Sequence, residues 1–170
     1  TEAWQDSVEN SNTVAKADIS VSYNGQLVLQ ASDTPVFAVK LLWKGKPDKN
    51  AKILHDEWER AYGEMQWISP ENTGIMPWYF FINNNTATEC YGVETSPNAM
   101  CCWKFTDDGL EFTADVRCGK EGVILNGRQL NVATLLQNEY TGEISDACDA
   151  FCKLMCKNPR KVEYPIYGGN

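Results

Sequence analysis

The sequence is poor in histidine, in positive charge and in long apolar runs. Its 170 residues include one histidine, and the chain has 15 Lys and Arg but 23 Asp and Glu, which gives a net charge of −8. We expect no nucleic-acid partner, because neutralising a phosphate backbone needs clustered Lys and Arg. We expect no membrane partner either, because no apolar run approaches the roughly 18–20 residues that span a bilayer. Neutral ligands such as sugars are compatible with this composition.

The single histidine limits the catalytic chemistry that the chain can support. A Ser or Cys nucleophile needs a base beside it, and nothing near His55 is typical of a nucleophile elbow. The glycines of 119–122 and 168–169 are too sparse for a phosphate-binding loop, and neither segment opens a predicted helix. We therefore expect no cofactor and no nucleophilic site.

The seven cysteines do not follow a zinc-binding pattern. Cys148, Cys152 and Cys156 are spaced four residues apart near one face of a predicted helix, whereas zinc sites use Cys pairs on turns, completed by His or a second pair. We interpret them as small apolar residues of a docking face and expect no metal. Seven is odd, so at least one thiol is unpaired within the chain, and a disulfide from the helix to Cys118 or Cys90 stays open.

Short apolar segments separated by Gly and Pro turns predict a mainly β chain, an antiparallel β-sandwich with one C-terminal α-helix. Residues 110–116 alternate apolar and polar side chains, as in a half-buried strand, and 78–82 are apolar throughout, as in a strand buried on both faces. A helix is predicted over 143–157, where apolar residues recur at helical spacing. The other predicted strands are 19–23, 27–31, 36–43, 100–105, 123–125 and 130–136.

The pattern divides the chain into three parts. Residues 1–17 are polar and aperiodic and are expected to be a flexible N-terminal arm. Residues 18–140 are expected to form the sandwich, and 141–170 the helix and an extended linker. The chain starts at Thr1 without a methionine and shows no signal-peptide pattern, which indicates a processed or trimmed chain.

The first predicted hairpin turns at Asn24-Gly25. A two-residue turn there would set the two apolar stripes of the hairpin on opposite faces. We therefore expect a three-residue loop with a bulge at Gly25, which places both stripes on one common face.

One segment, Leu54–Trp67, concentrates unusual side chains. Its fourteen positions hold two Trp, one Tyr, four carboxylates, one Arg and the only His, and its apolar residues follow neither a strand nor a helix period. Such a segment is typical of a recognition surface or a domain contact, with aromatic rings that stack on sugars and polar groups that bind hydroxyls. Its acids could form a glycosidase pair, but acids are common here, and we assign no catalytic residue. The candidate substrate-binding or domain-contact residues are Asp56, Trp58, Arg60, Tyr62 and Trp67.

Outside this segment, Trp78 and Trp103 offer further flat faces to a sugar ring. Most tryptophans in a globular domain are core residues that satisfy their N–H internally. We therefore expect most of the six tryptophans of the chain to be buried, with at least one as a candidate for ligand contact.

Several segments together resemble one enzyme family. Asp56–Trp67 is similar to the Trp-Glu-Arg-x-Tyr-Gly-x-x-x-Trp pattern in one branch of melibiase-type α-galactosidases, glycoside hydrolase family thirty-six. Thr88–Val93 with Pro97–Met100 resembles the next loop of their N-terminal domain, and 110–130 resembles its closing strands. Residues 144–170, which end in Tyr-Pro-Ile-Tyr-Gly-Gly-Asn, are similar to the linker that leads into the barrel.

The resemblance, which runs from about Gln26 to Asn170, implies a supersandwich-like, non-catalytic domain. In this family a retaining mechanism uses two carboxylates on a (β/α)₈ barrel, which would follow Asn170. The implied partners are the protein's own catalytic barrel, absent from these 170 residues, and a galactoside or other carbohydrate. The domain would pack on the barrel and help to shape its sugar pocket, and the parent is expected to be a secreted or periplasmic glycosidase.

Two other functions stay open. A free-standing carbohydrate-binding module would present a shallow aromatic platform away from the chain terminus. An oligomerisation domain would form a homo-oligomer through a mostly apolar contact of roughly 1,200 Å² or more. A domain that only packs on a barrel would instead expose an apolar patch near Leu54–Trp67 and near the terminal helix.

Overall fold

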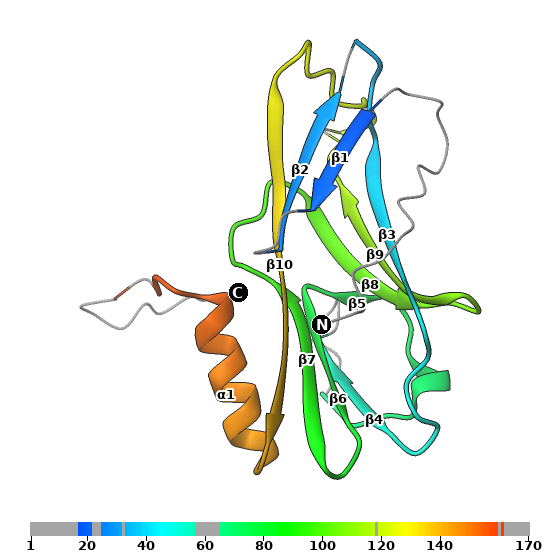
Figure 1. Ribbon diagram of the computed structural model, residues 1–170, viewed down its shortest axis with the longest axis vertical. Coiled ribbons are helices and arrows are strands. Elements are labelled where there is room, and N and C mark those ends of the chain that lie inside the picture. The colour runs from blue at the N-terminus through cyan, green and yellow to red at the C-terminus, as the bar shows by residue number, and fades with distance from the viewer. Residues whose placement is uncertain are drawn as a thin grey trace, which may run out of the picture.

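Two antiparallel sheets and one α-helix make up the part of the chain that the computed structural model describes, namely residues 17–21, 25–31, 33–56, 65–117, 119–159 and 161 (Figure 1). The larger sheet has the strand order β1 (Ala17–Val21), β2 (Gln26–Ala31), β10 (Gln129–Thr141), β7 (Ala87–Val93), β6 (Tyr79–Asn83) and β4 (Lys52–His55). The smaller sheet has the order β3 (Ala38–Lys44), β9 (Gly109–Asp115), β8 (Met100–Phe105) and β5 (Met76–Pro77). A short 3-10 helix, η1 (Pro70–Asn72), follows β4, and α1 (Ile144–Met155) follows β10. The predicted β-sandwich with one C-terminal helix is confirmed.

The main hydrophobic core lies between the two sheets. Its largest side chain is Trp103 on β8, which is 1% exposed and whose ring centroid lies 4.6 Å from that of Phe112 and 5.6 Å from that of Phe80. Successive residues of a strand point to opposite faces, so each strand gives alternate side chains to this core. On β9 these are Leu110, Phe112 and Ala114, and the predicted half-buried strand is confirmed.

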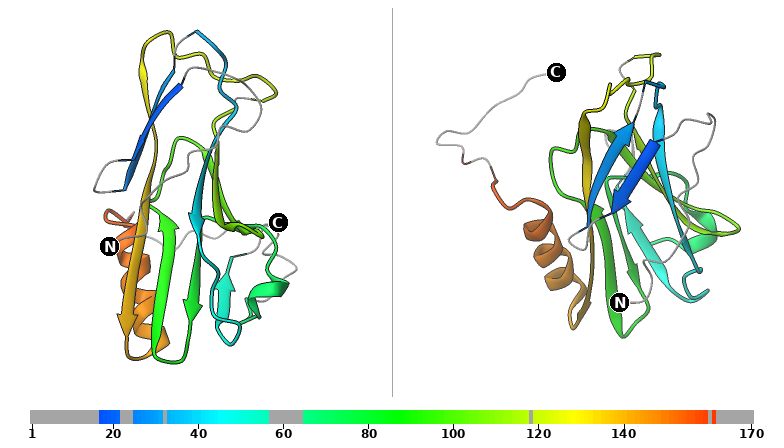
Figure 2. Two further views of the ribbon diagram at one scale, coloured as in Figure 1. Left: turned by 45° about the vertical axis from the view of Figure 1, so that its right-hand side comes forward. Right: turned by 45° about the horizontal axis from the view of Figure 1, so that its top comes forward.

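A second, smaller core lies on the outer face of the larger sheet, under α1 (Figure 2). Phe151 and Met155 of the helix pack with Phe81 of β6 and Cys90 of β7, and the Phe81 and Phe151 ring centroids are 6.0 Å apart. Phe80 belongs to the main core while Phe81 belongs to this second one, which confirms burial on both faces for the middle of the predicted strand. The predicted burial of Trp78, at the start of that strand, is wrong, because Trp78 precedes β6 and is 45% exposed. None of the described helices is long and apolar enough to cross a membrane.

The placement of Thr88–Val93 in a loop, which came from the resemblance, is wrong. These residues belong to β7, a central strand that pairs with β6 on one side and β10 on the other. Thr88 is 1% exposed, and its hydroxyl accepts a hydrogen bond from Nδ2 of Asn83 at 3.0 Å. A threonine can be buried in a strand when its hydroxyl has a hydrogen-bond partner. Thr88 therefore breaks the apolar pattern of the sequence although the strand continues through it.

The predicted strand 123–125 does not form within the described chain. Of these three residues only Val123 pairs, in an isolated bridge with Val36. The expected turn follows, with Asn126 at φ 48° and Gly127 at φ 77°, closed by the Arg128 amide, which donates to the Leu125 carbonyl at 3.0 Å. β10 then continues to Thr141, beyond the predicted end at 136, because its second half pairs with β7.

In the first hairpin β1 pairs with β2 in antiparallel register, with Ile19 opposite Leu29 and Val21 opposite Leu27. The predicted turn at Asn24-Gly25 falls partly outside the described residues. Gly25 is described, with φ 79°, and its carbonyl accepts a hydrogen bond from the Leu135 amide at 2.8 Å. A Cβ at Gly25 would lie 2.1 Å from the Leu135 carbonyl oxygen, so only glycine lets β10 approach this closely.

Candidate functional site

The structure describes two of the five candidate residues. Asp56 directly follows β4 and is buried, with 7% of its surface exposed. Trp67 is half-buried and packs against the second core beneath α1, so it contributes to the sandwich itself. Trp58, Arg60 and Tyr62 lie outside the described residues.

His55 and Asp56 are buried side by side where β4 ends. Nδ1 of His55 lies 2.6 Å from the backbone carbonyl oxygen of Asp56. Because a carbonyl oxygen only accepts, Nδ1 carries a hydrogen and donates it to this oxygen. This bond fixes the direction of the backbone at Asp56, the first residue of the segment that resembles the family motif.

Trp78 lies near this point, between the end of β5 and the start of β6. His55 pairs with Phe80 in antiparallel register, so Asp56 reaches the start of β6, just after Trp78. Trp78 is 45% exposed and Met100, at the start of β8, is 59% exposed. The Trp78 amide donates to the Cys101 carbonyl at 3.3 Å, which places Trp78 beside Met100. We call Asp56, Trp78 and Met100 the Trp78 corner.

The backbone of Trp78 is strained. Its φ of 59° lies in the left-handed region, which costs a residue with a Cβ roughly 1–2 kcal/mol. Two hydrogen bonds hold it there: the amide bond to Cys101, and the indole Nε1 of Trp103, which donates to the Trp78 carbonyl at 3.2 Å. A bulky residue kept in this conformation marks a candidate functional position, because the surrounding structure over-determines it. The two tryptophans therefore divide: Trp103 is a core residue, and Trp78 presents its ring to the surface.

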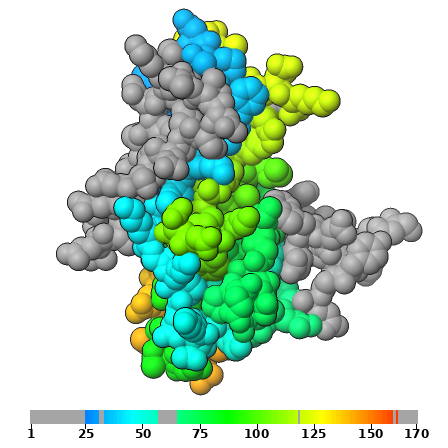
Figure 3. All heavy atoms as spheres, turned by 90° about the vertical axis from the view of Figure 1, so that its right-hand side faces the viewer, coloured from blue at the N-terminus to red at the C-terminus, as the bar shows by residue number. Residues whose placement is uncertain are grey.

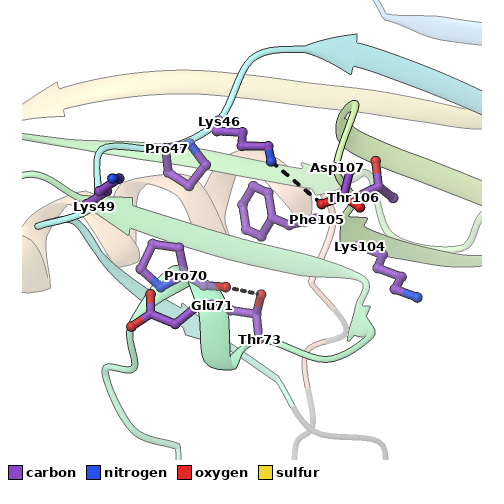
Figure 4. Close-up of a pocket in the computed structure, with 10 residues that line it drawn as sticks. All are labelled: Lys46, Pro47, Lys49, Pro70, Glu71, Thr73, Lys104, Phe105, Thr106 and Asp107. Atoms are coloured by element: carbon purple, nitrogen blue, oxygen red, sulfur yellow. Dashed lines mark hydrogen bonds and ion pairs between the residues drawn. The ribbon is translucent and has the colours of Figure 1, made fainter.

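A groove of about 770 Å³ opens at the other end of β8. Its floor is the ring of Phe105, which lies between Pro47 and Pro70 (Figure 4). Phe105 is itself held by the core, since its ring meets that of Phe80 edge-on at a centroid distance of 5.7 Å. The face that carries the groove is seen in Figure 3, where the β3–β4 loop, η1 and the β8–β9 turn come together. We call this site the Phe105 groove.

Charged side chains surround the floor of the Phe105 groove. Lys46, Lys49 and Lys104 contribute three ammonium groups, and Glu71 and Asp107 contribute two carboxylates. Nζ of Lys46 lies 3.8 Å from Oδ1 of Asp107, and both side chains are largely exposed. Among the residues that the structure describes, neither Lys49 nor Lys104 forms an ion pair.

The described cysteines are free thiols, and the two that are buried, Cys90 and Cys101, are not candidate nucleophiles. Burial raises the pKa of Cys90 to about 12, with further contributions from Cys148 and Cys152, and burial raises the pKa of Cys101 to about 12. These thiols therefore stay protonated at neutral pH, whereas a nucleophile must be a thiolate. Within the described part of the chain, no group of three His, Cys, Asp or Glu side chains could hold a metal.

The Phe105 groove has no signal in the linear sequence. Its lining comes from residues 46–49, 70–73 and 104–107, which only the fold brings together. Each of the three pieces looks like an ordinary polar turn, with Pro, Lys and Asp. The Trp78 corner had a partial signal, because Trp78 belonged to the stacking candidates, but its exposure follows from a backbone angle that no residue pattern predicts.

The resemblance to glycoside hydrolases rests on sequence motifs alone. No protein-family model matches this chain, and no match was found among curated proteins or solved structures.

Proposed function

We propose that this chain is the non-catalytic N-terminal β-sandwich domain of a glycoside hydrolase resembling melibiase-type α-galactosidases. In this proposal the domain packs on a (β/α)₈ barrel and helps to shape its sugar pocket. The catalytic carboxylates belong to the barrel, and Asp56, Trp58, Arg60, Tyr62 and Trp67 supply a wall of the pocket or the domain contact.

The observation that carries the proposal is the Trp78 corner. The segment that resembles the family motif begins at Asp56, at the same corner of the sheet where Trp78 is held exposed in a strained conformation. Trp78 and Met100 each expose apolar side-chain surface, which is favourable when a partner covers it. The strain is consistent with selection for the direction of the ring rather than for the stability of the isolated domain.

The anchors on both sides of the segment support the same reading. Asp56 is buried at one end, and Trp67 packs on the second core at the other. Both described ends of the segment therefore belong to the sandwich, and the residues between them lie outside the described part of the chain. Fixed end points of this kind suit a domain contact built on a rigid support.

The test uses the full-length gene product. We expect it to hydrolyse an aryl α-galactoside with retention of configuration, and we expect Trp78→Gly to lower kcat/KM several-fold. Glycine tolerates the left-handed backbone, so the free energy of unfolding should change by no more than about 1 kcal/mol. The matched control is Ile124→Ser, which removes an apolar side chain that is 44% exposed outside the corner and should leave kcat/KM unchanged.

Two results would contradict the proposal. One is a full-length product without glycosidase activity. The other is equal kcat/KM for the Trp78→Gly and Ile124→Ser proteins, which would show that the corner contributes nothing to the enzyme. Isothermal titration of the 170-residue chain with galactosides gives an independent check, since firm binding by the isolated domain would favour a free-standing module.

A further inference from the structure

The Phe105 groove combines a flat apolar floor with a polar rim. The Phe105 ring and the two proline rings beside it offer the kind of surface on which the C–H face of a pyranose packs (Figure 4). Thr73 and Thr106 use their hydroxyl hydrogens internally, donating to the carbonyls of Pro70 at 2.8 Å and Gly109 at 3.0 Å. Each hydroxyl oxygen is therefore left as an acceptor for a sugar hydroxyl.

The side chains that line the groove carry one more ammonium group than carboxylates, and the exposed carboxylates of Asp48 and Asp108 flank them on the same loops. Lys46 offsets the charge of Asp107, which leaves Lys49 and Lys104 against Glu71. The two lysines stand toward opposite ends of the groove (Figure 4). Ammonium groups that lack an internal carboxylate partner favour a ligand that brings its own carboxylates.

The loops that form the groove are fixed by their own hydrogen bonds. In the β3–β4 loop the Ala51 amide donates to the Asp48 carbonyl at 3.0 Å, and in the β8–β9 turn the Thr106 amide donates to the Gly109 carbonyl at 2.7 Å. Lys52 Nζ donates to Ser69 Oγ at 3.2 Å and so ties β4 to the start of η1. A groove that needs little ordering loses less free energy when a ligand binds.

We propose that the Phe105 groove binds a carboxylate-bearing saccharide, such as a short uronic-acid oligomer. The sugar rings pack on Phe105, Lys49 and Lys104 bind carboxylates, and the threonine hydroxyls with Glu71 accept hydrogen bonds from sugar hydroxyls. The volume of about 770 Å³ falls within the roughly 300–1,000 Å³ typical of ligand pockets. The site lies at the opposite end of β8 from the Trp78 corner and does not depend on the proposed parent enzyme.

Isothermal titration of the whole chain at low salt tests the proposal with three probes. These are trigalacturonate, a neutral galactotriose, and triglutamate, which carries several carboxylates without a sugar. We expect saturable binding of trigalacturonate that weakens as salt is added, because the ammonium groups are exposed. We expect binding of the other two probes to be at least about fivefold weaker, since each lacks one of the two recognised features.

Two pairs of variants locate the site. Lys49→Ala with Lys104→Ala should weaken trigalacturonate binding by about fivefold to tenfold, as expected for two exposed charge pairs. Lys120→Ala with Lys153→Ala removes the same charge outside the groove and should have no such effect. Phe105→Leu keeps apolar volume but loses the flat ring, and should weaken binding with thermal unfolding measured alongside to verify the fold.

Several outcomes would overturn the proposal. Absence of saturable trigalacturonate binding excludes the site. Equal affinity for the neutral sugar excludes the role of the carboxylates, and equal affinity for triglutamate indicates an acidic peptide instead of a saccharide. Equal weakening by the two double-lysine variants would show that only the net charge of the chain matters.

Discussion

The Trp78 corner and the Phe105 groove lie at the two ends of one strand but use an aromatic ring in opposite ways. β8 begins at Met100, beside Trp78, and ends at Phe105, roughly 17 Å away at about 3.4 Å per residue. At the corner the ring is exposed at the cost of backbone strain. At the groove the ring is half-buried, packed on Phe80, and surrounded by charges.

The difference indicates different ligands. An exposed indole next to a methionine buries much area only against a broad apolar surface, such as another domain. A ring recessed between prolines and lysines fits a small polar ligand, whose hydroxyls and charges meet the rim. One strand therefore carries the proposed docking surface at its start and the proposed ligand site at its end, and both lie next to the core around Trp103.

Trp103→Ala should affect the Trp78 corner and the Phe105 groove together, because both lie next to the core around Trp103. The indole is 1% exposed and contacts Trp43, Phe80 and Phe112, so its loss should lower the free energy of unfolding by about 3–5 kcal/mol. Urea unfolding followed by circular dichroism measures this. Trp103→Phe keeps a ring but removes the N–H that donates to Trp78, and should cost clearly less. If the two variants were equally unstable, the hydrogen bond rather than the packing would hold β8.

Gly92→Ala should disturb the corner side and spare the groove. A Cβ at Gly92 would meet Sδ of Met155 at 2.8 Å, Cε1 of Phe151 at 3.0 Å and Cβ of Tyr79 at 3.1 Å, so the side chains between α1 and β7 must repack. Overpacking of this kind costs about 1–3 kcal/mol. Gly74→Ala is the control, because a Cβ there meets no atom within 4 Å. The midpoint of thermal unfolding should be lower for Gly92→Ala than for Gly74→Ala. Equal midpoints would mean that the side chains of α1 adjust to the added Cβ without a loss of stability.

Asp107→Asn should have the smallest effect and should show that the rim charges do not hold the fold. The Lys46–Asp107 contact is long and exposed, so the free energy of unfolding should change by no more than about 0.5 kcal/mol. Glu111→Gln tests a half-buried pair, in which Lys40 donates to Glu111 at 3.0 Å, and should cost about 1 kcal/mol. A loss on Asp107→Asn as large as that on Glu111→Gln, by urea unfolding, would assign the groove a structural role.

The sandwich could be predicted because the burial of a strand determines which of its residues are apolar. The alternation around Phe112 predicted a strand buried on one face, and the continuous apolar run around Phe81 predicted burial on both faces. Phe112 and Phe81 are both buried in the structure. The helix was readable from the spacing of Phe151 and Met155. In each case the side chains that set the pattern are the ones that pack.

The remaining features depend on information that local sequence does not carry. Thr88 is a polar residue whose burial depends on a hydrogen bond from Asn83, and the sequence does not show that bond, so β7 was not predicted. β4 and β5 are too short to show a period, and the exposure of Trp78 depends on one backbone angle. The groove needs three loops to meet around Phe105, which is a property of the tertiary fold.

The pairing of β2 with β10 has a consequence for how the chain is made. Gln30 and Gln129, 99 positions apart, face each other across these strands. At a synthesis rate of about 5–20 residues per second, β2 emerges from the ribosome roughly 5–20 seconds before its partner. Throughout that interval the first hairpin has an open edge able to pair with a strand of another nascent chain. This edge can therefore be covered only after β10 has been synthesised and has left the ribosome.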